Sequence, residues 1–148
     1  MTNLHYVVDA SVAIKLFVEQ PMTDPAIALF SLLVIDPMSG LYVPDLFFVE
    51  CANVLWQYVR RTPYPVEQAR QSMVRLKQFA LKVTPTGDLV SVALDLAIAH
   101  RISAYDACYL ALAQRLEIEL VTADQKLVQT LAGTPYRVRS LNRWTVEG

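Results

Sequence analysis

The chain has 148 residues, of which 54% are hydrophobic and 18% charged, and its formal net charge at pH 7 is −1. This length predicts one domain, residues 1–148, which buries roughly 68–70% of the surface that the unfolded chain exposes. The longest uncharged run, residues 25–35, has 11 residues, whereas a bilayer-spanning helix needs about 20, so a transmembrane helix is excluded.

Cysteine, histidine and the first residues exclude further classes. The start, M-T-N-L-H, lacks the basic residues of a secretory signal peptide, so we expect a cytoplasmic protein. Cys51 and Cys108 lie in apolar helical patterns without C-x-x-C or Cys/His spacing, which predicts buried free thiols and no zinc site. His5 and His100 are isolated in the sequence and suggest no role.

The near-zero net charge hides an uneven distribution. Residues 60–82 contain six basic residues and one acid, Glu67, and the C-terminal tail adds three arginines against Glu147. These groups form either ordinary solvated surfaces or an electrostatic footprint for nucleic acid.

The chain begins with a short apolar run, residues 4–8, which predicts a strand buried on both faces. Asp9 ends this run, and residues 10–18 switch to helical character. A second helix is predicted over residues 24–35, with Pro25 in its first turn.

Residues 41–43 predict a second short strand, which Pro44 stops. Asp45 is expected to cap a long helix that runs to Arg61. An amphipathic helix over residues 66–81 follows a proline-containing connection.

The rest of the chain continues to alternate between strands and helices. We predict a strand at 82–84, a helix at 89–100, a helix at 103–116, a strand at 119–122, a short helix from 124 to 131 and a last strand at 136–141. This alternation predicts the α/β class: a three-layer domain whose central, mainly parallel sheet has four to five short strands flanked by helices.

Three acids near predicted strand ends and helix starts have structural explanations. Asp9 and Asp124 follow strands, and Asp124 can cap the helix after it. Ser11 either caps the helix after Asp9, the interpretation that we favour, or contacts the site. Asp106 has capping-box spacing to Ser103, so its carboxylate can reach back to the backbone at the helix start.

A fourth acid, Glu50, shares one helix face with Asn53 and Gln57, at positions i, i+3 and i+7. A solvent-facing polar stripe is one interpretation. The remaining surface of this helix is more apolar than one core contact needs, which favours contact with another chain. Trp56 and Tyr58 would serve either a protein interface or stacking on nucleic-acid bases.

These four carboxylates indicate a functional site only when they are considered as a set. In a parallel sheet, Asp9 and Asp124 occupy carboxyl ends of strands, and Glu50 and Asp106 lie within about a turn and a half of helix starts, near the same edge. Carboxylates crowded together raise one another's pKa unless a cation is present. Mg²⁺ or Mn²⁺ prefers such oxygen ligands and can activate water against a phosphodiester, so we expect a metal site.

Four segments, in this order, resemble the acidic motifs of PIN-domain ribonucleases, most closely the VapC-type toxins of toxin–antitoxin pairs. They read Y-V-V-D-A-S-V-A-I-K, V-P-D-L-F-F-V-E-C-A-N-V-L, S-A-Y-D-A-C-Y-L-A-L-A and L-V-T-A-D-Q-K-L. The resemblance implies a PIN-like fold with Asp9, Glu50, Asp106 and Asp124 as the metal-binding and catalytic acids. It also implies that Ser11, Asn53 and Thr122 support the site.

The same resemblance implies a function. It predicts an Mg²⁺- or Mn²⁺-dependent endoribonuclease that hydrolyses RNA with metal-activated water, forms a homodimer and is neutralised by a small cognate antitoxin (VapB-like). The sequence departs from some relatives at Gln125, where they carry a further acid. One metal or two therefore stays open, as do the RNA and its cleavage site.

Two other classes of function compete with this one. A phosphate-accepting receiver domain also gathers acids at strand ends, but it needs an acidic pair after the first strand, and here Ala10 follows Asp9. A non-catalytic PIN-like protein-binding module would use the acids only as helix caps and the apolar helices as its contact surface.

Overall fold

The computed structural model describes residues 4–146, and its centre is a sheet in the order β3-β2-β1-β4-β5. Every pair of neighbouring strands is parallel. The strands are β1 (His5–Val8), β2 (Gly40–Pro44), β3 (Lys82–Thr84), β4 (Glu119–Thr122) and β5 (Val138–Ser140). The predicted α/β class and parallel sheet are therefore confirmed.

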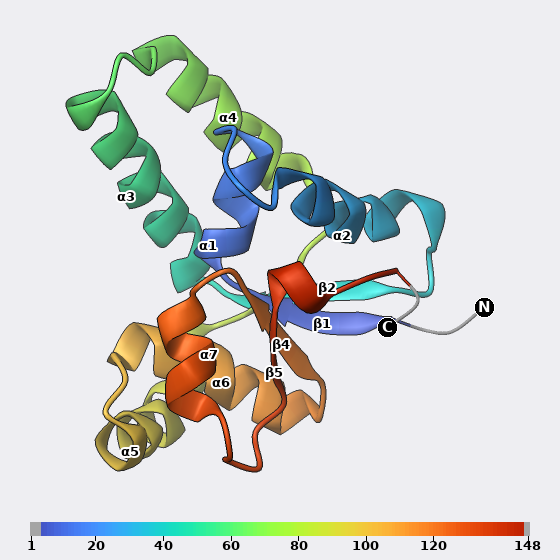
Figure 1. Ribbon diagram of the computed structural model, residues 1–148, viewed down its shortest axis with the longest axis vertical. Coiled ribbons are helices and arrows are strands. Elements are labelled where there is room, and N and C mark those ends of the chain that lie inside the picture. The colour runs from blue at the N-terminus through green and yellow to red at the C-terminus, as the bar shows by residue number, and fades with distance from the viewer. Residues whose placement is uncertain (1–3, 147–148) are drawn as a thin grey trace.

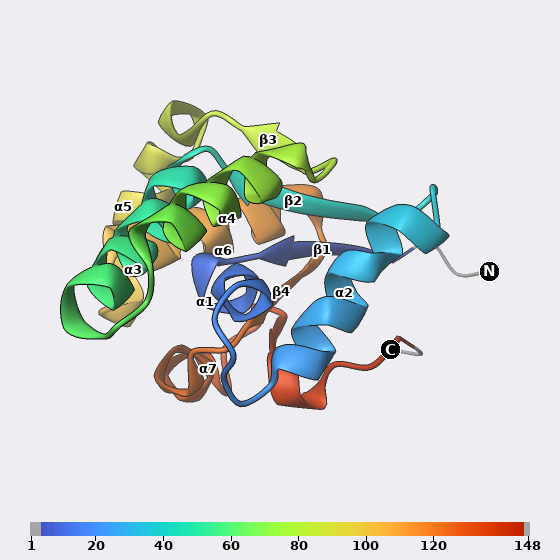
Figure 2. The ribbon, with the colours of Figure 1, turned by 90° about the horizontal axis from the view of Figure 1, so that it is seen from above.

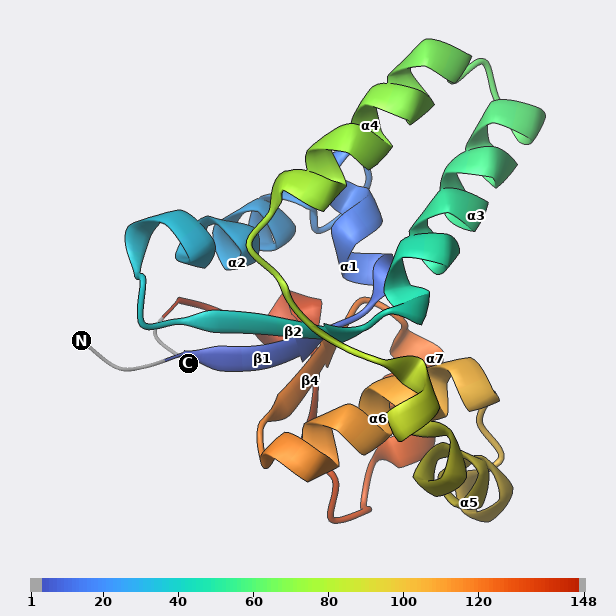
Figure 3. The ribbon, with the colours of Figure 1, turned by 180° about the vertical axis from the view of Figure 1, so that it is seen from behind.

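Helices cover both faces of this sheet. Figures 1 and 3 show α1 to α4 on one side and α5 to α7 on the other, which gives three layers. The helices are α1 (Ala10–Ala13), α2 (Thr23–Ile35), α3 (Leu46–Arg61), α4 (Val66–Gln78), α5 (Val90–His100), α6 (Ala104–Leu116) and α7 (Gln125–Leu131). Short 3₁₀ turns are η1 (Ile14–Leu16), η2 (Thr86–Asp88) and η3 (Leu141–Arg143).

Strands β1 and β4, which lie side by side in the sheet, are deeply buried. Val7 and Val8 of β1 and Leu120 and Val121 of β4 have no exposed surface. Burial on both faces explains why these strands read as continuous apolar runs. Because Val8 pairs with Val121, the next residues of the two strands reach the same edge together.

That edge is the point at which the chain changes sides of the sheet. The connection from β1 to β2 passes over one face through α1 and α2, and the connection from β3 to β4 passes over the other through α5 and α6, as Figure 2 shows from above. Open α/β sheets bind ligands in the crevice at such a switch point, outside the carboxyl ends of the strands.

Three predicted elements are shorter in the structure. The helix expected over 66–81 ends at Gln78, because Phe79 is extended. The helix expected over 10–18 stops at Ala13 and tightens into η1, because the chain must turn before α2, where Met22 takes a left-handed φ of 70°. The strand expected over 136–141 is β5 alone, because the chain turns into η3 to bury Leu141 in the core.

The predicted cap at Asp45 is wrong. Asp45 has helical dihedrals (φ −67°, ψ −17°) rather than the extended ones of an N-cap, and its side chain caps no amide of α3. Its Oδ1 instead accepts hydrogen bonds from the Thr86 backbone N–H, at 2.8 Å, and from the Thr86 hydroxyl. This contact joins the start of α3 to η2.

Helices α3 and α4 form an arm that projects beyond the sheet (Figures 1 and 3). The rings of Tyr58 and Tyr64 lie 6.2 Å apart across it, and the Tyr64 hydroxyl donates to the Phe17 carbonyl at 3.2 Å. The arm is thereby tied to the segment after η1.

Within residues 4–146, no helix has the length and apolar character that a membrane span requires. Residues 1–3, on which the expected absence of a leader depends, lie outside this range. Cys51 and Cys108 are both free and buried, as predicted.

Candidate active site

The four acids identified in the sequence line one groove of about 780 Å³. Asp9 follows β1 and caps α1, and Asp124 follows β4 and caps α7. Glu50 lies in the second turn of α3, and Asp106 in the first turn of α6. Elements from both faces of the sheet thus bring all four carboxylates to the switch point.

Asp9 is the most enclosed of these acids, with 6% of its surface exposed. The Ser11 hydroxyl donates to its Oδ1 and the Thr122 hydroxyl to its Oδ2, both at 2.5 Å. Burial raises the pKa of Asp9 to about 6, although these hydrogen bonds oppose the shift; the nearby charge of Asp106 raises it further. Asp9 is therefore fixed in place and costly to ionise.

Ser11 is not the helix cap that we expected. Asp9 takes that position, and its Oδ1 accepts from the Val12 N–H at 3.3 Å. The Ser11 oxygen instead accepts from the Ala123 N–H at 2.9 Å. Ser11 consequently ties the turn after β1 to the turn after β4.

Asp106 lies among the other acids. Its backbone N–H donates to Ser103 Oγ at 3.0 Å, which is half of the predicted capping box. The return bond does not form: among residues 4–146, no donor is hydrogen-bonded to the Asp106 carboxylate. Burial, and then the charge of Asp124, raises the pKa of Asp106. Its carboxylate is therefore free to bind a ligand in the groove.

Glu50 has a partner that the sequence did not reveal. The Tyr109 hydroxyl donates to Glu50 Oε1 at 2.6 Å, and Tyr109 is 1% exposed. Burial raises the pKa of Glu50, and the charge of Asp106 adds to this. Tyr109 also lines the groove. Its place three residues after Asp106, on the same helix face, was the available signal.

The remaining candidates lie at the rim. Asp124 is exposed, and its Oδ1 caps α7 by accepting from Leu127 N–H at 3.2 Å, as one of our interpretations predicted. Asn53 lines the groove beside Glu50. Gln125 faces away from the groove, because its amide donates to Ser140 Oγ at 2.7 Å.

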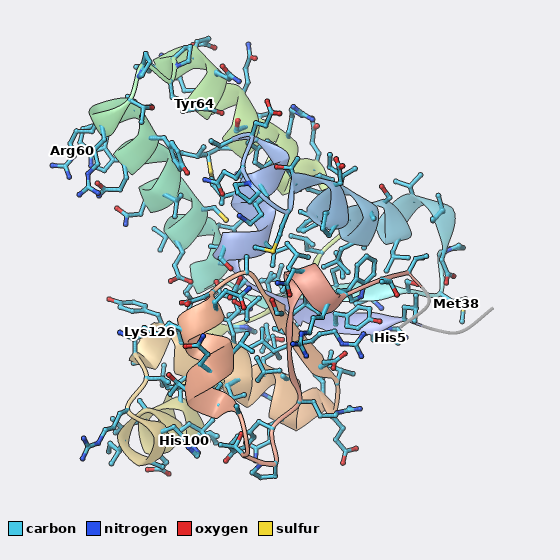
Figure 4. The ribbon with its side chains drawn as sticks, viewed as in Figure 1. His5, Met38, Arg60, Tyr64, His100 and Lys126 are labelled. Atoms are coloured by element: carbon cyan, nitrogen blue, oxygen red, sulfur yellow. The ribbon has the colours of Figure 1, made fainter. Side chains whose placement is uncertain are left out.

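The groove lining contains the oxygen donors that a hard cation prefers and no histidine or cysteine. His5 lies on β1 and His100 on α5, well apart from each other (Figure 4). Within residues 4–146, however, no three acidic, histidine or cysteine side chains form a ready metal cluster. The carboxylates surround one groove and interact through their charges, so binding an ion requires side-chain rotation toward it.

Comparison with known proteins places this fold and site in a class. The PIN domain profile matches residues 6–131, so the chain belongs to the PIN domain family. This result confirms the resemblance and excludes the receiver-domain alternative.

Within that family the chain is similar to VapC proteins. It is 32% identical over 125 residues to ribonuclease VapC3 of Pyrobaculum aerophilum, covering 83% of this chain and 92% of the relative. It is 31% identical over 124 residues to ribonuclease VapC9 of Mycobacterium tuberculosis, covering 84% and 89%. A toxin–antitoxin complex from Klebsiella pneumoniae shares the fold, with a TM-score of 0.62 at 20% identity over 92% of this chain and 97% of that one.

Proposed function

We propose that residues 1–148 form one domain that acts as a VapC-type endoribonuclease and hydrolyses phosphodiester bonds of RNA. The observation that carries this proposal is the groove at the switch point, where Asp9, Glu50, Asp106 and Asp124 converge from four separate elements. Helix caps alone do not explain Glu50 or the carboxylate of Asp106, because neither caps a helix. The purely structural alternative, a non-catalytic binding module, is therefore not favoured.

The four carboxylates are the proposed ligands for Mg²⁺ or Mn²⁺. The fit rests on the chemistry of the donor set, on the raised pKa values of Asp9, Glu50 and Asp106, and on the absence of an ion pair to any of the four acids within residues 4–146. When bound, such an ion supplies Lewis-acid activation of water and neutralises negative charge on the phosphate.

The protein's own residues set the geometry for this chemistry. Ser11 and Thr122 hold the two oxygens of Asp9, so the carboxylate presents a fixed face to the groove. Tyr109 orients Glu50 through a single hydrogen bond. At the rim, the side chain of Tyr105 is 63% exposed and offers a ring on which an unpaired base can stack.

The proposed partners are the RNA, a second copy of the chain and a small antitoxin, within the cytoplasm. Arg60, near the outer end of the arm in Figure 4, is among the basic residues that can attract RNA. Exposed apolar side chains on α5, including Leu94 and Ile98, and Trp56 on α3 provide surface for protein contacts. The comparison with a toxin–antitoxin complex supports this assembly.

The test is RNA cleavage by purified protein in Mg²⁺ or Mn²⁺. Asp106→Asn removes the charge that interacts with the other three acids, and we expect activity to fall by on the order of 10²–10³. The matched control is Asp95→Asn, an exposed acid on α5 that does not line the groove. If the Asp106→Asn protein cuts RNA at the wild-type rate, the proposed mechanism is wrong.

A further inference from the structure

One wall of the groove contains a buried lysine that the acidic site does not explain. Lys15 lies in η1 and is 8% exposed. Its Nζ donates to Gln20 Oε1 at 3.0 Å. Within the described part of the chain, the ion pairs are Arg70–Glu67 and Arg139–Glu119, so no carboxylate lies within 4.0 Å of this ammonium.

The position of Lys15 is as unusual as its burial. The residues that line the groove include four acids and one base, and that base is Lys15. Lys15 and Gln20 also line a second hollow of about 520 Å³, between η1 and the start of α2. The lysine therefore forms part of the wall between the proposed catalytic groove and a neighbouring surface depression.

Burying an ammonium without a counter-ion is costly, so the charge needs a reason. An ammonium has three N–H donors, and protein acceptors among residues 4–146 take one of them. The remaining donors border a groove that already gathers acids suited to a cation. An anionic ligand in the same groove would satisfy them.

We propose that Lys15 binds a phosphate oxygen of the RNA strand in the groove, through the donors that Gln20 leaves free. This inference rests on the proposed function and deepens it: Lys15 is a substrate-binding residue rather than a metal ligand. Its ammonium holds the sugar–phosphate backbone beside the carboxylates whatever the base sequence, because phosphate contacts carry no sequence information.

A purely structural role for Lys15 is the alternative to exclude. Gln20, its partner, donates through Nε2 to the Tyr58 hydroxyl of the arm, so Lys15, Gln20 and Tyr58 form a chain from η1 to α3. If Lys15 only supports this chain, removing Gln20 should have the same effect as removing the charge. If Lys15 binds phosphate, the two changes should differ.

The experiment measures binding of a fluorescein-labelled single-stranded RNA 12-mer by anisotropy, in Mg²⁺ and across a range of KCl. The parent protein carries Asp106→Asn, so that RNA is bound without being cut. Onto it are placed Lys15→Met, Lys15→Gln, Lys15→Arg and Gln20→Ala. The control is Arg115→Met, which removes an exposed basic residue in the last turn of α6, outside both the groove and the basic segment of residues 60–82. Melting temperatures identify variants that fold; Lys15→Gln serves if Lys15→Met does not.

We expect neutral Lys15 variants to weaken binding by about 10-fold or more, the size of a lost charged hydrogen bond. The slope of log Kd against log salt should fall by about 0.7, as for one phosphate contact on a single strand. Lys15→Arg should restore the slope, and Gln20→Ala and Arg115→Met should keep it.

The inference is overturned if the parent and its neutral Lys15 variants have equal slopes of log Kd against log salt. It is also overturned if Gln20→Ala lowers this slope as much as the neutral Lys15 variants do. A Lys15 that instead serves a protein partner's carboxylate would give the first of these results. The wild-type cleavage assay separates the two proposals: if wild-type protein cuts RNA while Lys15 proves dispensable, only the inference about Lys15 fails. If no RNA is bound or cut, both proposals fail.

Discussion

The two sides of the groove hold their carboxylates in opposite ways. On the strand side, Asp9 is buried and both of its oxygens accept hydroxyl hydrogen bonds from Ser11 and Thr122. On the helix side, Glu50 has one hydroxyl partner and the Asp106 carboxylate has none among residues 4–146. The Asp9 side chain on the strand side is thus held in one position, whereas the Glu50 and Asp106 side chains on the helix side can move toward a ligand.

This difference explains why the described residues, 4–146, hold no ready metal cluster although all four acids share a groove. Crowded carboxylates separate when no cation holds them together. Asp9 cannot move, because its hydrogen bonds tie it to Ser11 in α1 and to Thr122 in β4. The rearrangement on metal binding should therefore occur at Asp106 and Glu50.

The largest effect that would sharpen this comparison concerns the cost of ionising Asp9. The pKa of Asp9 rises from 3.8 in the unfolded chain to about 6 in the folded protein, so the folded protein binds this proton more tightly. The resulting contribution to the free energy of unfolding is complete below pH 3.8 and is lost as pH rises through 6. Over the whole pH range the loss is about 3 kcal/mol, because one pKa unit corresponds to 1.36 kcal/mol. Urea unfolding in EDTA should show lower stability at pH 7 than at pH 5.

Asp9→Asn should remove most of that pH dependence and stabilise the metal-free protein at pH 7, while Asp95→Asn should change neither. Mn²⁺ should restore stability to the wild-type protein, because a ligand that binds only the folded state stabilises it. Equal unfolding free energies at pH 5 and pH 7 in EDTA would contradict the inference that the buried Asp9 carboxyl group is costly to ionise.

The next effect tests the strand side as a support for the metal. Thr122→Val keeps the shape of a side chain with no exposed surface but removes its hydrogen bond to Asp9 Oδ2. We expect a loss of about 10- to 100-fold in Mn²⁺ affinity, measured by titration calorimetry. Thr130→Val, an exposed threonine on α7, is the control. Unchanged affinity would show that Asp9 needs no such support.

The smallest effect concerns the helix side. Tyr109→Phe removes the single hydroxyl that orients Glu50. Since Glu50 is only half-buried and can find water instead, we expect kcat/KM for RNA to fall by about 3- to 10-fold. Tyr136→Phe, outside the groove, should cleave at the wild-type rate. If Tyr109→Phe lowers kcat/KM more than Thr122→Val does in the same cleavage assay, the comparison between the two sides is reversed.

The sequence was informative wherever a structural cause is local. Apolar runs ending in Asp9 and Thr122 predicted buried parallel strands. The spacing of Ser103 to Asp106 predicted a capping box at the start of α6, of which the Ser103 half forms and the Asp106 half does not. Because parallel strands end at one edge of a sheet, these local features also indicated where the acids would gather.

The sequence was less informative where contacts join distant segments. Asp45 bonds to Thr86, 41 residues away, rather than to its own helix. Ser11 contacts Ala123 across the switch point, and Tyr109 reaches Glu50 from another helix. No local periodicity reports such pairings, because each depends on how two elements pack. The burial of Lys15 was likewise not predicted, because no feature of the neighbouring sequence indicates it.

The edge strand β5 has a consequence that the groove residues do not reveal. It lies beyond residues 6–131, the part matched by the family profile, and holds none of the proposed site residues. Yet β5 pairs with β4, which carries Thr122, and Trp144, beyond β5, packs edge-on against Tyr6 of β1, with 6.0 Å between the ring centroids. A chain cut after residue 131 would keep all four groove acids and still leave one side of β4 unpaired, an open template for strand addition by another molecule. Loss of the C-terminal segment would therefore disturb the groove through Thr122, which holds Asp9, although it would remove none of the four groove acids.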